Sequence, residues 1–444
     1  MRDQYDIIVV GGGPAGTTVS GLLSKWGRRV LLLEKEKFPR YHIGESLVPG
    51  MIPVIDELGA TRIVEQLGAI KKYGISLLWG ESPEPWTLRF DEVSPFPYAY
   101  EVKRAEFDNL LLTHTRRLGT TVIEEANVRE VLFDGDRCTG VRYSPVHSDD
   151  VIDVHAPFII DASGQAKIMA RHFKTVGWHS DLKNLAAWTY FQGGSRYAAQ
   201  AAGNVVIEHK APGWLWMIPF SDHTCSIGFV APIAEYAASG LKPAAVLYRC
   251  IDEAREIKRL LAGAVEVSQV RTAKDWSYTC ERMSGPGFMQ VGDAAAFIDP
   301  LFSTGVMLAM KSASSAARAV NKILDEPNLE TSIRQSYEDG YRAFLDALIS
   351  FVRFFYDPSR KIVEYFEEAR KLVDPMKHLE AREDFIVLIS GVIGVRPILE
   401  SVPDAPVTSD SGQHLGGGHR FDWGGLHVES SHLGGRGSYI QRSR

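Results

Sequence analysis

Two tryptophans separated by one residue are the side chains in this sequence that point most directly to a specific chemistry. Trp214 and Trp216 lie in the segment 213–219, which ends in Ile218 and Pro219. Residues i and i+2 of a β-strand point to the same face, so the two indole rings would lie side by side. Tryptophan is highly buried on average, so a pair of core aromatics is the ordinary interpretation. A wall of two rings beside a reaction site is the alternative, which the other motifs favour.

A glycine-rich turn near the N-terminus has the spacing of a dinucleotide-binding site. It follows a β-branched segment at 5–10 that predicts a buried strand, and precedes an apolar segment at 17–27 with helical spacing. Gly11 would permit the tight turn, Gly13 would let the backbone approach a pyrophosphate, and Gly16 would let the helix pack closely on the strand. The pyrophosphate would lie at the helix N-terminus, where free N–H groups and the helix dipole attract an anion.

An acidic residue completes this dinucleotide pattern. A second strand is predicted at 30–33, and Glu34 follows it directly. An acid at this place accepts hydrogen bonds from ribose hydroxyls in the strand–turn–helix–strand unit. The alternative is a plain glycine-rich surface turn, which would not need the second strand or the acid.

Three further segments indicate that the dinucleotide is FAD. Asp293 lies in the segment 290–294, and Asp299–Pro300 begins six residues later. This resembles the second FAD motif of the glutathione-reductase and hydroxybenzoate-hydroxylase flavoproteins, in which the aspartate holds a ribityl hydroxyl. The segment 158–164 is similar to their middle motif, and Arg104 resembles the arginine that reaches the cofactor. An aspartate in such a segment is otherwise a common helix cap.

The strands and helices that the sequence pattern indicates around these residues predict an α/β fold. We expect a Rossmann-like FAD-binding domain of the hydroxybenzoate-hydroxylase and glutathione-reductase type, an antiparallel-sheet substrate domain and a helical C-terminal region. Asp134–Gly135 predicts a hairpin within 122–143. Strands are expected at 188–192, 205–209, 214–219 and 225–230, and helices at 241–264, 306–325 and 332–373, the last interrupted at Asp357–Pro358. Aromatic residues in that last helical region belong either to the core or to a lid over an aromatic substrate.

The expected domains are discontinuous in the sequence. The FAD-binding domain comprises 1–80, 100–175 and 270–330, and the substrate domain comprises 81–99 and 176–269. A helical lid region follows at 331–400. The tail at 401–444 is rich in Gly, Ser and His, and we expect it to be disordered.

Composition excludes several classes of function. The chain has 444 residues, 45% of them hydrophobic, and a net charge of -6 with both signs well mixed. We therefore expect no nucleic-acid partner and no membrane partner. No apolar segment is long enough to span a bilayer, and no signal peptide is apparent. The four cysteines and the histidines of the tail fit no metal template, so we expect no metal site in a reduced, cytoplasmic protein.

Together, these motifs resemble the flavin-dependent halogenases over residues 5 to about 395. The pattern Trp214-x-Trp216-x-Ile218-Pro219 is that family's signature, and the segment 38–47 is similar to theirs. Lys72, followed by Tyr73–Gly74, matches the position of the family's catalytic lysine, and Lys71 is the neighbour that a misalignment by one residue would select. The residues expected at the cofactor are Gly11, Gly13, Pro14, Ala15, Gly16, Glu34, Arg40, Ser46, Arg104, Asp293, Pro300, Gly305 and Val306.

The resemblance implies an FADH₂- and O₂-dependent halogenation in secondary-metabolite (antibiotic) biosynthesis. In this family a flavin C4a-hydroperoxide oxidises chloride or bromide to hypohalous acid. The resemblance assigns halide binding to a turn before a helix, here Ser303, Thr304 and Gly305, in which the backbone N–H groups of Thr304 and Gly305 would form an anion nest. It makes the tryptophan pair a barrier between flavin and substrate. Lys72 would hydrogen-bond hypohalous acid or form a haloamine. With only one nucleotide motif visible, a separate NAD(P)H flavin reductase is the expected partner.

One departure from the family pattern bears on the substrate. Tryptophan halogenases carry a glutamate directly before Ser-Thr-Gly, and here that position is Phe302. The sequence therefore resembles the branch that acts on phenols and pyrroles, and within it the enzymes whose aromatic substrate is tethered to a carrier protein. The segments 79–87 and 275–278 are similar to theirs.

Two other functions use the same scaffold. A flavin monooxygenase or an isoprenoid-type flavin reductase would share the FAD motifs, but would not need Trp214, Trp216 and Lys72 together. A flavin-binding protein without catalysis would need neither the halide turn nor the lysine.

Overall fold

The computed structural model describes residues 4–373 and 380–392, and the predicted tail at 401–444 lies outside these ranges. The described residues belong to one compact unit. Its first layer is a six-stranded sheet in the order β18-β19-β11-β1-β2-β7, in which all neighbouring pairs except β18–β19 are parallel. The strands are β1 (Ile7–Val10), β2 (Val30–Leu33), β7 (Thr121–Ile123), β11 (Phe158–Asp161), β18 (Ser284–Gly285) and β19 (Phe288–Gln290).

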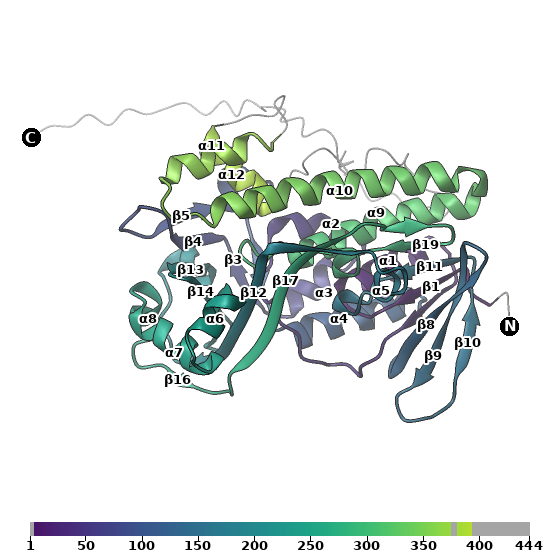
Figure 1. The fold of residues 1–444 in the computed structure, drawn as a ribbon, viewed down its shortest axis with the longest axis horizontal. Coiled ribbons are helices and arrows are strands. Elements are labelled where there is room, and N and C mark those ends of the chain that lie inside the picture. The colour runs from purple at the N-terminus through teal and green to yellow at the C-terminus, as the bar shows by residue number, and fades with distance from the viewer. Residues whose placement is uncertain (1–3, 374–379, 393–444) are drawn as a thin grey trace, which may run out of the picture. The chain divides into compact units, whose positions relative to one another are not determined.

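Both faces of this sheet are covered, which explains why β1 and β2 are apolar at every position (Figure 1). Ile7 and Val9 face the main core, where helices α1 (Pro14–Lys25), α4 (Arg104–Arg117) and α9 (Gly305–Asp325) pack together. Ile8 and Val10 face a second core under a three-stranded sheet. The strands of that sheet are β8 (Ala126–Asp134), β9 (Arg137–Pro145) and β10 (Ile152–His155), and the neighbouring helix is α5 (Ile168–Phe173). The predicted hairpin at 122–143 is confirmed as β8–β9.

The predicted substrate sheet is present and larger than expected. Its path is β20-β17-β12-β15-β14-β13-β4-β5, and β16 pairs with β12. The sheet is mixed, because β13 pairs with β4 in parallel while its other neighbouring pairs are antiparallel. The strands are β4 (Gly74–Leu78), β5 (Trp86–Arg89), β12 (Val176–Gln192), β13 (Val205–Lys210), β14 (Gly213–Pro219), β15 (Thr224–Pro232), β16 (Val265–Glu266), β17 (Arg271–Cys280) and β20 (Ala296–Phe297).

This sheet runs across the domain boundaries that the sequence suggested. β4 lies before the expected boundary at residue 80, and β17 lies after the one at 270, yet both are hydrogen-bonded into the same sheet. The division into an FAD-binding and a substrate domain therefore remains a prediction. A separate ladder joins β3 (Ile70–Lys72) to β6 (Ala99–Glu101).

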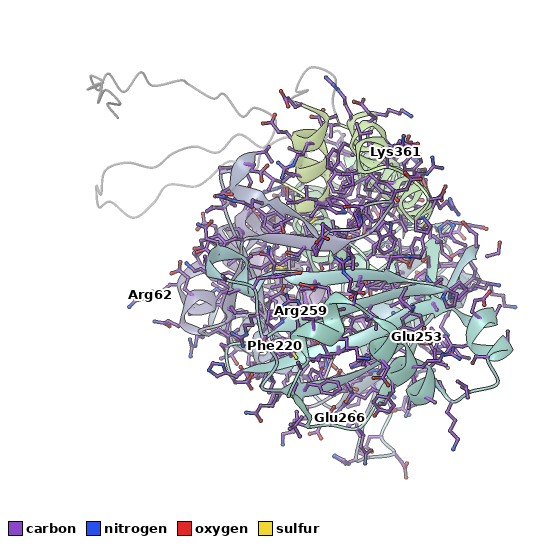
Figure 2. All side chains as sticks on the ribbon, turned by 90° about the vertical axis from the view of Figure 1, so that its left-hand side faces the viewer. Arg62, Phe220, Glu253, Arg259, Glu266 and Lys361 are labelled. Atoms are coloured by element: carbon purple, nitrogen blue, oxygen red, sulfur yellow. The ribbon has the colours of Figure 1, made fainter. Side chains whose placement is uncertain are left out.

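Helices cover one face of the large sheet, and the C-terminal helices pack near its other side. Figure 2 looks onto the first group, around Glu253 and Arg259, with Lys361 of the C-terminal group at the top. The first group is α6 (Ile233–Ala238), α7 (Pro243–Glu253) and α8 (Glu256–Leu260). The second is α10 (Glu330–Phe355), α11 (Ile362–Arg370) and α12 (Ala381–Ser390), so the predicted break near Asp357–Pro358 is confirmed.

The remaining helices of the described residues are short. The α-helices are α2 (Ile52–Glu57) and α3 (Thr61–Gln66), and the 3-10 helices are η1 (Pro49–Met51), η2 (Phe90–Glu92), η3 (Gly164–Ala166), η4 (Ala199–Gly203), η5 (Gly292–Ala294) and η6 (Pro327–Leu329).

Candidate functional site

The turn between β1 and α1 has the geometry of an anion site. Gly11 has a φ of 106°, and a Cβ at Gly16 would overlap the carbonyl oxygen of Gly11. Around Gly13, by contrast, a Cβ would meet only a guanidinium nitrogen of Arg40, at 3.6 Å. Helix α1 begins with Pro14 and Ala15, and it has no side-chain cap. The first backbone N–H groups of α1 are therefore left to bind an anion.

Glu34 stands at the end of β2, as the sequence predicted, and is 4% exposed. Its Oε2 accepts the backbone N–H of Gly12 at 2.6 Å, and its Oε1 accepts that of Glu36 at 2.8 Å. These bonds hold the carboxylate beside the glycine turn, where the ribose of a dinucleotide would lie.

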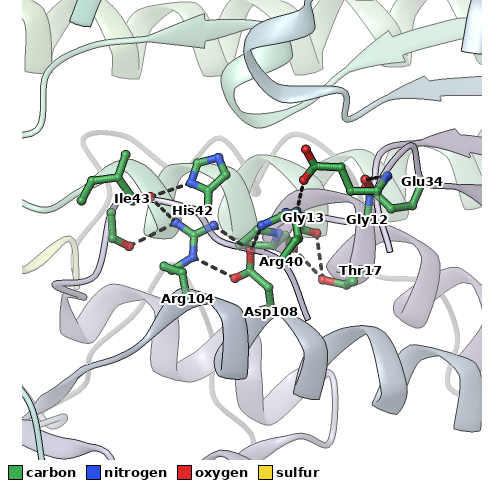
Figure 3. A network of polar contacts seen from close by, with 12 residues as sticks. Gly12, Gly13, Thr17, Glu34, Arg40, His42, Ile43, Arg104 and Asp108 are labelled. Atoms are coloured by element: carbon green, nitrogen blue, oxygen red, sulfur yellow. Dashed lines mark hydrogen bonds and ion pairs between the residues drawn. The ribbon is translucent and has the colours of Figure 1, made fainter. Parts of the chain in front are cut away.

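A buried ion cluster lies beside this turn (Figure 3). Asp108 on α4 receives Arg104 through two hydrogen bonds of 2.8 and 3.0 Å, and Arg40 through one of 3.0 Å. Burial favours the neutral acid, but the charges and hydrogen bonds of Arg104, together with Arg40, keep the pKa of Asp108 below its ordinary value. Arg104 also donates to the carbonyls of Ile43 and Gly44. Sequence reasoning missed Asp108, although its place four residues after Arg104 on a helix was a usable signal.

A partly buried carboxyl follows β19. Burial raises the pKa of Asp293 to about 6, against the opposing charge of Arg104. Among the described residues, none donates a hydrogen bond to this carboxylate, although the backbone carbonyl of Asp293 accepts one from Tyr278 at 2.5 Å. A carboxyl in this setting gains from an added donor, and a ribityl hydroxyl has the required chemistry.

The start of α9, like that of most described helices, has no side-chain cap. Ser303 has a left-handed φ of 59°, and its N–H bonds the carbonyl of Pro300 at 3.0 Å. Thr304 is the N-cap residue, and apart from its chain neighbours and the backbone of its own helix, no described residue lies within 4 Å of a Cβ built on Gly305. The N–H groups of Gly305 and Val306 have no acceptor within the helix. A small anion could approach this backbone closely, so the geometry suits the predicted halide site.

Phe302 explains why this turn carries no carboxylate. It is 3% exposed, and its ring lies 5.4 Å from that of Phe351, 4.9 Å from Phe355 and 6.3 Å from Phe385. The position directly before the turn therefore belongs to an aromatic core shared with α10 and α12. Among the aromatics of the 332–373 region, Phe351 and Phe355 are buried, which supports the interpretation as core.

The tryptophan pair lies on one face of β14, as the alternation predicts. The ring centroids of Trp214 and Trp216 are 6.0 Å apart, and both rings join the main core, whereas Leu215 between them faces the core under α6–α8. Trp216 Nε1 donates to Ser226 Oγ at 3.1 Å. A Cβ on Gly228 would overlap the Trp216 ring, so this glycine makes room for it.

The strand that carries the tryptophans ends in Ile218 and Pro219, which pair with Ser226 and Cys225 of β15. Ile218 is 7% exposed and belongs to the same core as the two rings.

A polar network connects the tryptophan pair with the segment before α9. Tyr356, which follows α10, accepts the Trp214 Nε1–H at 3.0 Å and donates to Asp299 Oδ2 at 2.9 Å. Asn184 of β12 donates to the same hydroxyl at 3.3 Å. Burial raises the pKa of Asp299 to about 7, although the Leu301 N–H and Tyr356 stabilise its anion. Tyr356 and Asn184 carry no sequence signal for this role, because they come from distant elements.

The two candidate lysines point to opposite sides of β3. Lys72 is 0% exposed, and its Nζ donates to Ser46 Oγ at 2.8 Å. Burial lowers the pKa of Lys72 to about 8, against the attraction of Glu101. Lys71 is exposed and lies 3.9 Å from the centroid of the Tyr98 ring. The buried lysine is therefore the one that the family pattern selected.

Other kinds of site find no support in the described part of the chain. No group of three or more His, Cys, Asp or Glu residues there could hold a metal ion. The cysteines Cys138, Cys225, Cys250 and Cys280 are buried and free. No described helix has the length and hydropathy to cross a membrane.

Comparisons with known proteins agree with this geometry. The sequence model of the family described as FAD binding domain matches residues 4–351. The tryptophan 2-halogenase of Chondromyces crocatus is 34% identical over 412 residues, which cover 88% of this chain and 77% of that protein. This chain belongs to the flavin-dependent halogenases. The 1H-pyrrole-2-carbonyl-(peptidyl-carrier protein) chlorinase of Pseudomonas fluorescens is 26% identical, with 86% of this chain and 90% of the chlorinase covered.

Solved structures of halogenases share the fold. The myxobacterial chondrochloren halogenase CndH is 37% identical with a TM-score of 0.76, and the alignment covers 89% of this halogenase and 92% of CndH. The flavin-dependent brominase Bmp2 is 27% identical with a TM-score of 0.77, covering 87% and 93% of the two chains. The halogenase is thus an oxidoreductase that uses FAD, O₂ and a halide. The uncapped start of α1, the open space at Gly13 and the carboxyl of Asp293 all fit FAD.

Proposed function

We propose that this halogenase chlorinates or brominates an electron-rich aromatic ring, a phenol or a pyrrole. The observation that carries the proposal is the place of Phe302 in an aromatic core directly before the helix turn at 303–305. A carboxylate at this position would be buried among phenyl rings without a partner, which is costly. The halogenase therefore acts without a side-chain base there, and electron-rich rings need that help least.

The chain's own residues divide the work among three places. The residues of the glycine turn, Glu34, Arg40, Arg104 and Asp293 would hold FAD, which when bound and reduced activates O₂ so that halide is oxidised. Thr304 and Gly305 would bind the halide through backbone N–H groups at the start of α9, and Ser303, whose own N–H bonds the Pro300 carbonyl, would shape the turn. Trp214 and Trp216 separate the cofactor from the substrate, and their ring positions are held by Tyr356 and Ser226.

Lys72 delivers the electrophile in this proposal. Its pKa of about 8 makes both the ammonium and the amine accessible near neutral pH. The ammonium would donate a hydrogen bond to hypohalous acid, whereas the amine would form a haloamine. Both routes hold the electrophile beside a nitrogen that lies away from bulk solvent, because Lys72 is fully buried.

The partners of the reaction are part of the same proposal. A separate NAD(P)H flavin reductase supplies reduced flavin, since only one dinucleotide motif precedes a helix in this chain. The substrate is tethered to a carrier protein, which the similarity to a peptidyl-carrier-protein chlorinase supports. A second candidate substrate is an indole, because the relative at 34% identity is named a tryptophan 2-halogenase.

The test is a reconstituted reaction with a flavin reductase, FAD, NADH and O₂. Free phenols, pyrrole-2-carboxylate and tryptophan are compared with carrier-bound phenol and pyrrole groups, in chloride and in bromide, and products are identified by mass spectrometry. Halogenated phenols or pyrroles are the expected products. Halogenation of tryptophan alone would replace the substrate proposal by the second candidate, and halide-independent oxygen insertion would contradict both.

Replacing the buried lysine tests its assigned role. Lys72→Ala should lower the halogenation rate by about 10²- to 10⁴-fold, the usual effect of losing a proton-transfer group. FAD binding and oxidation of reduced flavin by O₂ should persist, since of the predicted cofactor residues Lys72 bonds only Ser46. Lys71→Ala is the matched control and should halogenate at nearly the original rate. Equal losses in the two variants would contradict the role of Lys72.

A further inference from the structure

Two buried polar side chains meet Lys72. β3 and β6 pair so that Ile70 faces Glu101 and Lys72 faces Ala99. Because side chains alternate along a strand, Lys72 and Glu101 lie on the same face of this ladder. Ser46 forms an isolated bridge with Glu101. Glu101 is 1% exposed and Ser46 is 6% exposed, so all three groups lie away from bulk solvent.

The hydrogen bonds of this cluster run from Lys72 to Ser46 and from Ser46 to Glu101. Ser46 Oγ–H donates to Glu101 Oε1 at 3.0 Å, and Lys72 Nζ donates to Ser46 Oγ at 2.8 Å. A serine hydroxyl has a single proton, so once that proton points to Glu101, the oxygen can only accept from Lys72. The other carboxyl oxygen of Glu101 is buried, and no described residue bonds to it. The lysine is thus connected to one specific acid through one hydroxyl.

The electrostatics allow a proton to lie at either end. Burial raises the pKa of Glu101 to about 8, against the charge of Lys72, and the nearby Glu45 adds to the rise. Glu45 is itself a buried acid with hydrogen bonds from Tyr190 and Ser226, and with Arg104 and Lys103 as its cationic neighbours. Lys72 also lies 5.8 Å from the centroid of the Phe90 ring. The charged pair and the neutral pair have the same net charge, so exchange between them does not change the charge buried at the site.

We propose that Glu101, acting through Ser46, is the positioning residue and proton acceptor of Lys72. A proton moves from Lys72 Nζ to Ser46 Oγ while the hydroxyl proton of Ser46 moves to Glu101 Oε1. The lysine is left as a neutral amine with its lone pair, the serine is unchanged, and the carboxyl is protonated. The reverse transfer restores the ammonium. This inference rests on the proposed role of Lys72 in halogen delivery and names the group that sets its protonation state.

A second buried lysine provides an internal reference. Lys311 on α9 is 9% exposed, and burial lowers its pKa to about 8 as well. Its Nζ donates to the backbone carbonyl of Gly391 after α12. A carbonyl accepts a hydrogen bond but does not take up the proton, so Lys311 has the burial of Lys72 without the acid.

The direct test is the titration of both lysines by NMR in protein labelled with ¹³C-lysine, with Lys72→Arg and Lys311→Arg used to assign the signals. In Glu101→Gln the midpoint of Lys72 should fall by about one unit or more, because an opposite charge that favours the ammonium is removed. The midpoint of Lys311 should not change. Equal shifts of the two lysines, or none for Lys72, would overturn the proposal.

Two more variants separate this effect from a general loss of structure. Glu208→Gln removes another buried carboxylate, which accepts the backbone N–H groups of Arg255, Glu256 and Ile257. It should lower thermal stability while leaving the Lys72 midpoint unchanged. Ser46→Ala keeps both charges and removes the bridge, so it should slow halogenation even if Glu101→Gln does not fold.

Activity then distinguishes this proposal from the proposed function. Glu101→Gln should halogenate at least about tenfold more slowly and with a shifted pH profile, while FAD binding is retained. A wild-type rate and pH profile in both Glu101→Gln and Ser46→Ala would overturn the relay and leave the halogenase function intact. If the unaltered protein halogenates nothing in the panel, the proposed function fails, and the NMR titration still decides the link between Lys72 and Glu101.

Discussion

Two helices of this halogenase begin in similar ways and differ in what surrounds them. α1 and α9 both start without a side-chain cap, and an anion is expected at each. At α1 the glycines are required by the protein itself, because a Cβ on Gly11 or Gly16 would overlap backbone atoms. At α9 none of the described residues outside this turn and helix lies within 4 Å of a Cβ on Gly305. The first turn is built by close backbone packing and the second leaves open space.

The charges near the two helices differ as well. Beside α1, Asp108 is held as an anion by Arg104 and Arg40, so its pKa lies below the ordinary value even though it is buried. Before α9, Asp293 and Asp299 have raised pKa values because burial outweighs their partners. A fixed ion cluster suits a large cofactor that must be held in one orientation. An open turn suits a small anion that must enter and leave, and nearby carboxyls with raised pKa values repel that anion less than ionised ones would.

The largest expected effect comes from the closely packed turn. Gly16→Ala would place a methyl group on the Gly11 carbonyl, which should cost about 3 kcal/mol or more of stability. FAD binding should be lost with it, as measured by chemical unfolding and by flavin fluorescence. Gly13→Ala is the matched variant, since its new Cβ meets only Arg40 at 3.6 Å. It should unfold as the wild type does when FAD is absent and bind FAD more weakly. If Gly16→Ala were as stable as Gly13→Ala, the two glycines would not differ as we infer.

The next effect is on the pH dependence of the unfolding free energy, to which Asp299 and Asp108 should contribute with opposite signs. The pKa of Asp299 is raised to about 7 in the folded protein, so the folded state holds this proton more tightly than the unfolded state does. Its contribution therefore favours folding at low pH, decreases as the pH rises from about 4 to about 7, and is constant above that. Relative to Asp299→Asn, the wild type should lose up to a few kcal/mol of unfolding free energy across this window, since one pKa unit corresponds to about 1.4 kcal/mol.

Asp108, tested by Asp108→Asn, should contribute to the pH dependence of stability with the sign opposite to that of Asp299. The pKa of Asp108 is lowered, so its stabilising contribution is present above the ordinary carboxyl range and is lost as the pH falls below about 4. Urea unfolding of the wild type and both variants at a series of pH values measures the two slopes. Slopes of the same sign would show that the two carboxyls do not differ in the way the structure indicates.

The smallest expected effect concerns the open turn. Gly305→Ala adds a methyl group that meets no described residue beyond its own turn and helix, so the stability of the FAD-free protein should change by less than about 1 kcal/mol. The same methyl group lies where a halide would approach the backbone. The KM for chloride or bromide should therefore rise by about tenfold, equivalent to about 1.4 kcal/mol. A stable variant with an unchanged KM for halide would place the halide elsewhere.

Local patterns in the sequence predicted a large part of the fold and the local geometry around several candidate site residues. The glycine spacing at 11–16, the alternation around Trp214 and Trp216, and the hairpin at Asp134–Gly135 depend on neighbouring residues, and the structure places all three as expected. The choice of Lys72 over Lys71 came from family resemblance. The structure added the physical distinction, because one lysine is buried and the other is exposed.

What the sequence by itself determined is therefore the set of local units, since turn geometry, strand alternation and helix starts are decided within a few residues. Only the tertiary structure decided which side chains meet. Glu101 reaches Lys72 through Ser46, and Tyr356 joins Trp214 to Asp299, across segments that are far apart in the chain. The parallel pairing of β13 with β4 was equally invisible. Such contacts depend on how whole elements pack, and burial then sets the pKa values that the chemistry needs.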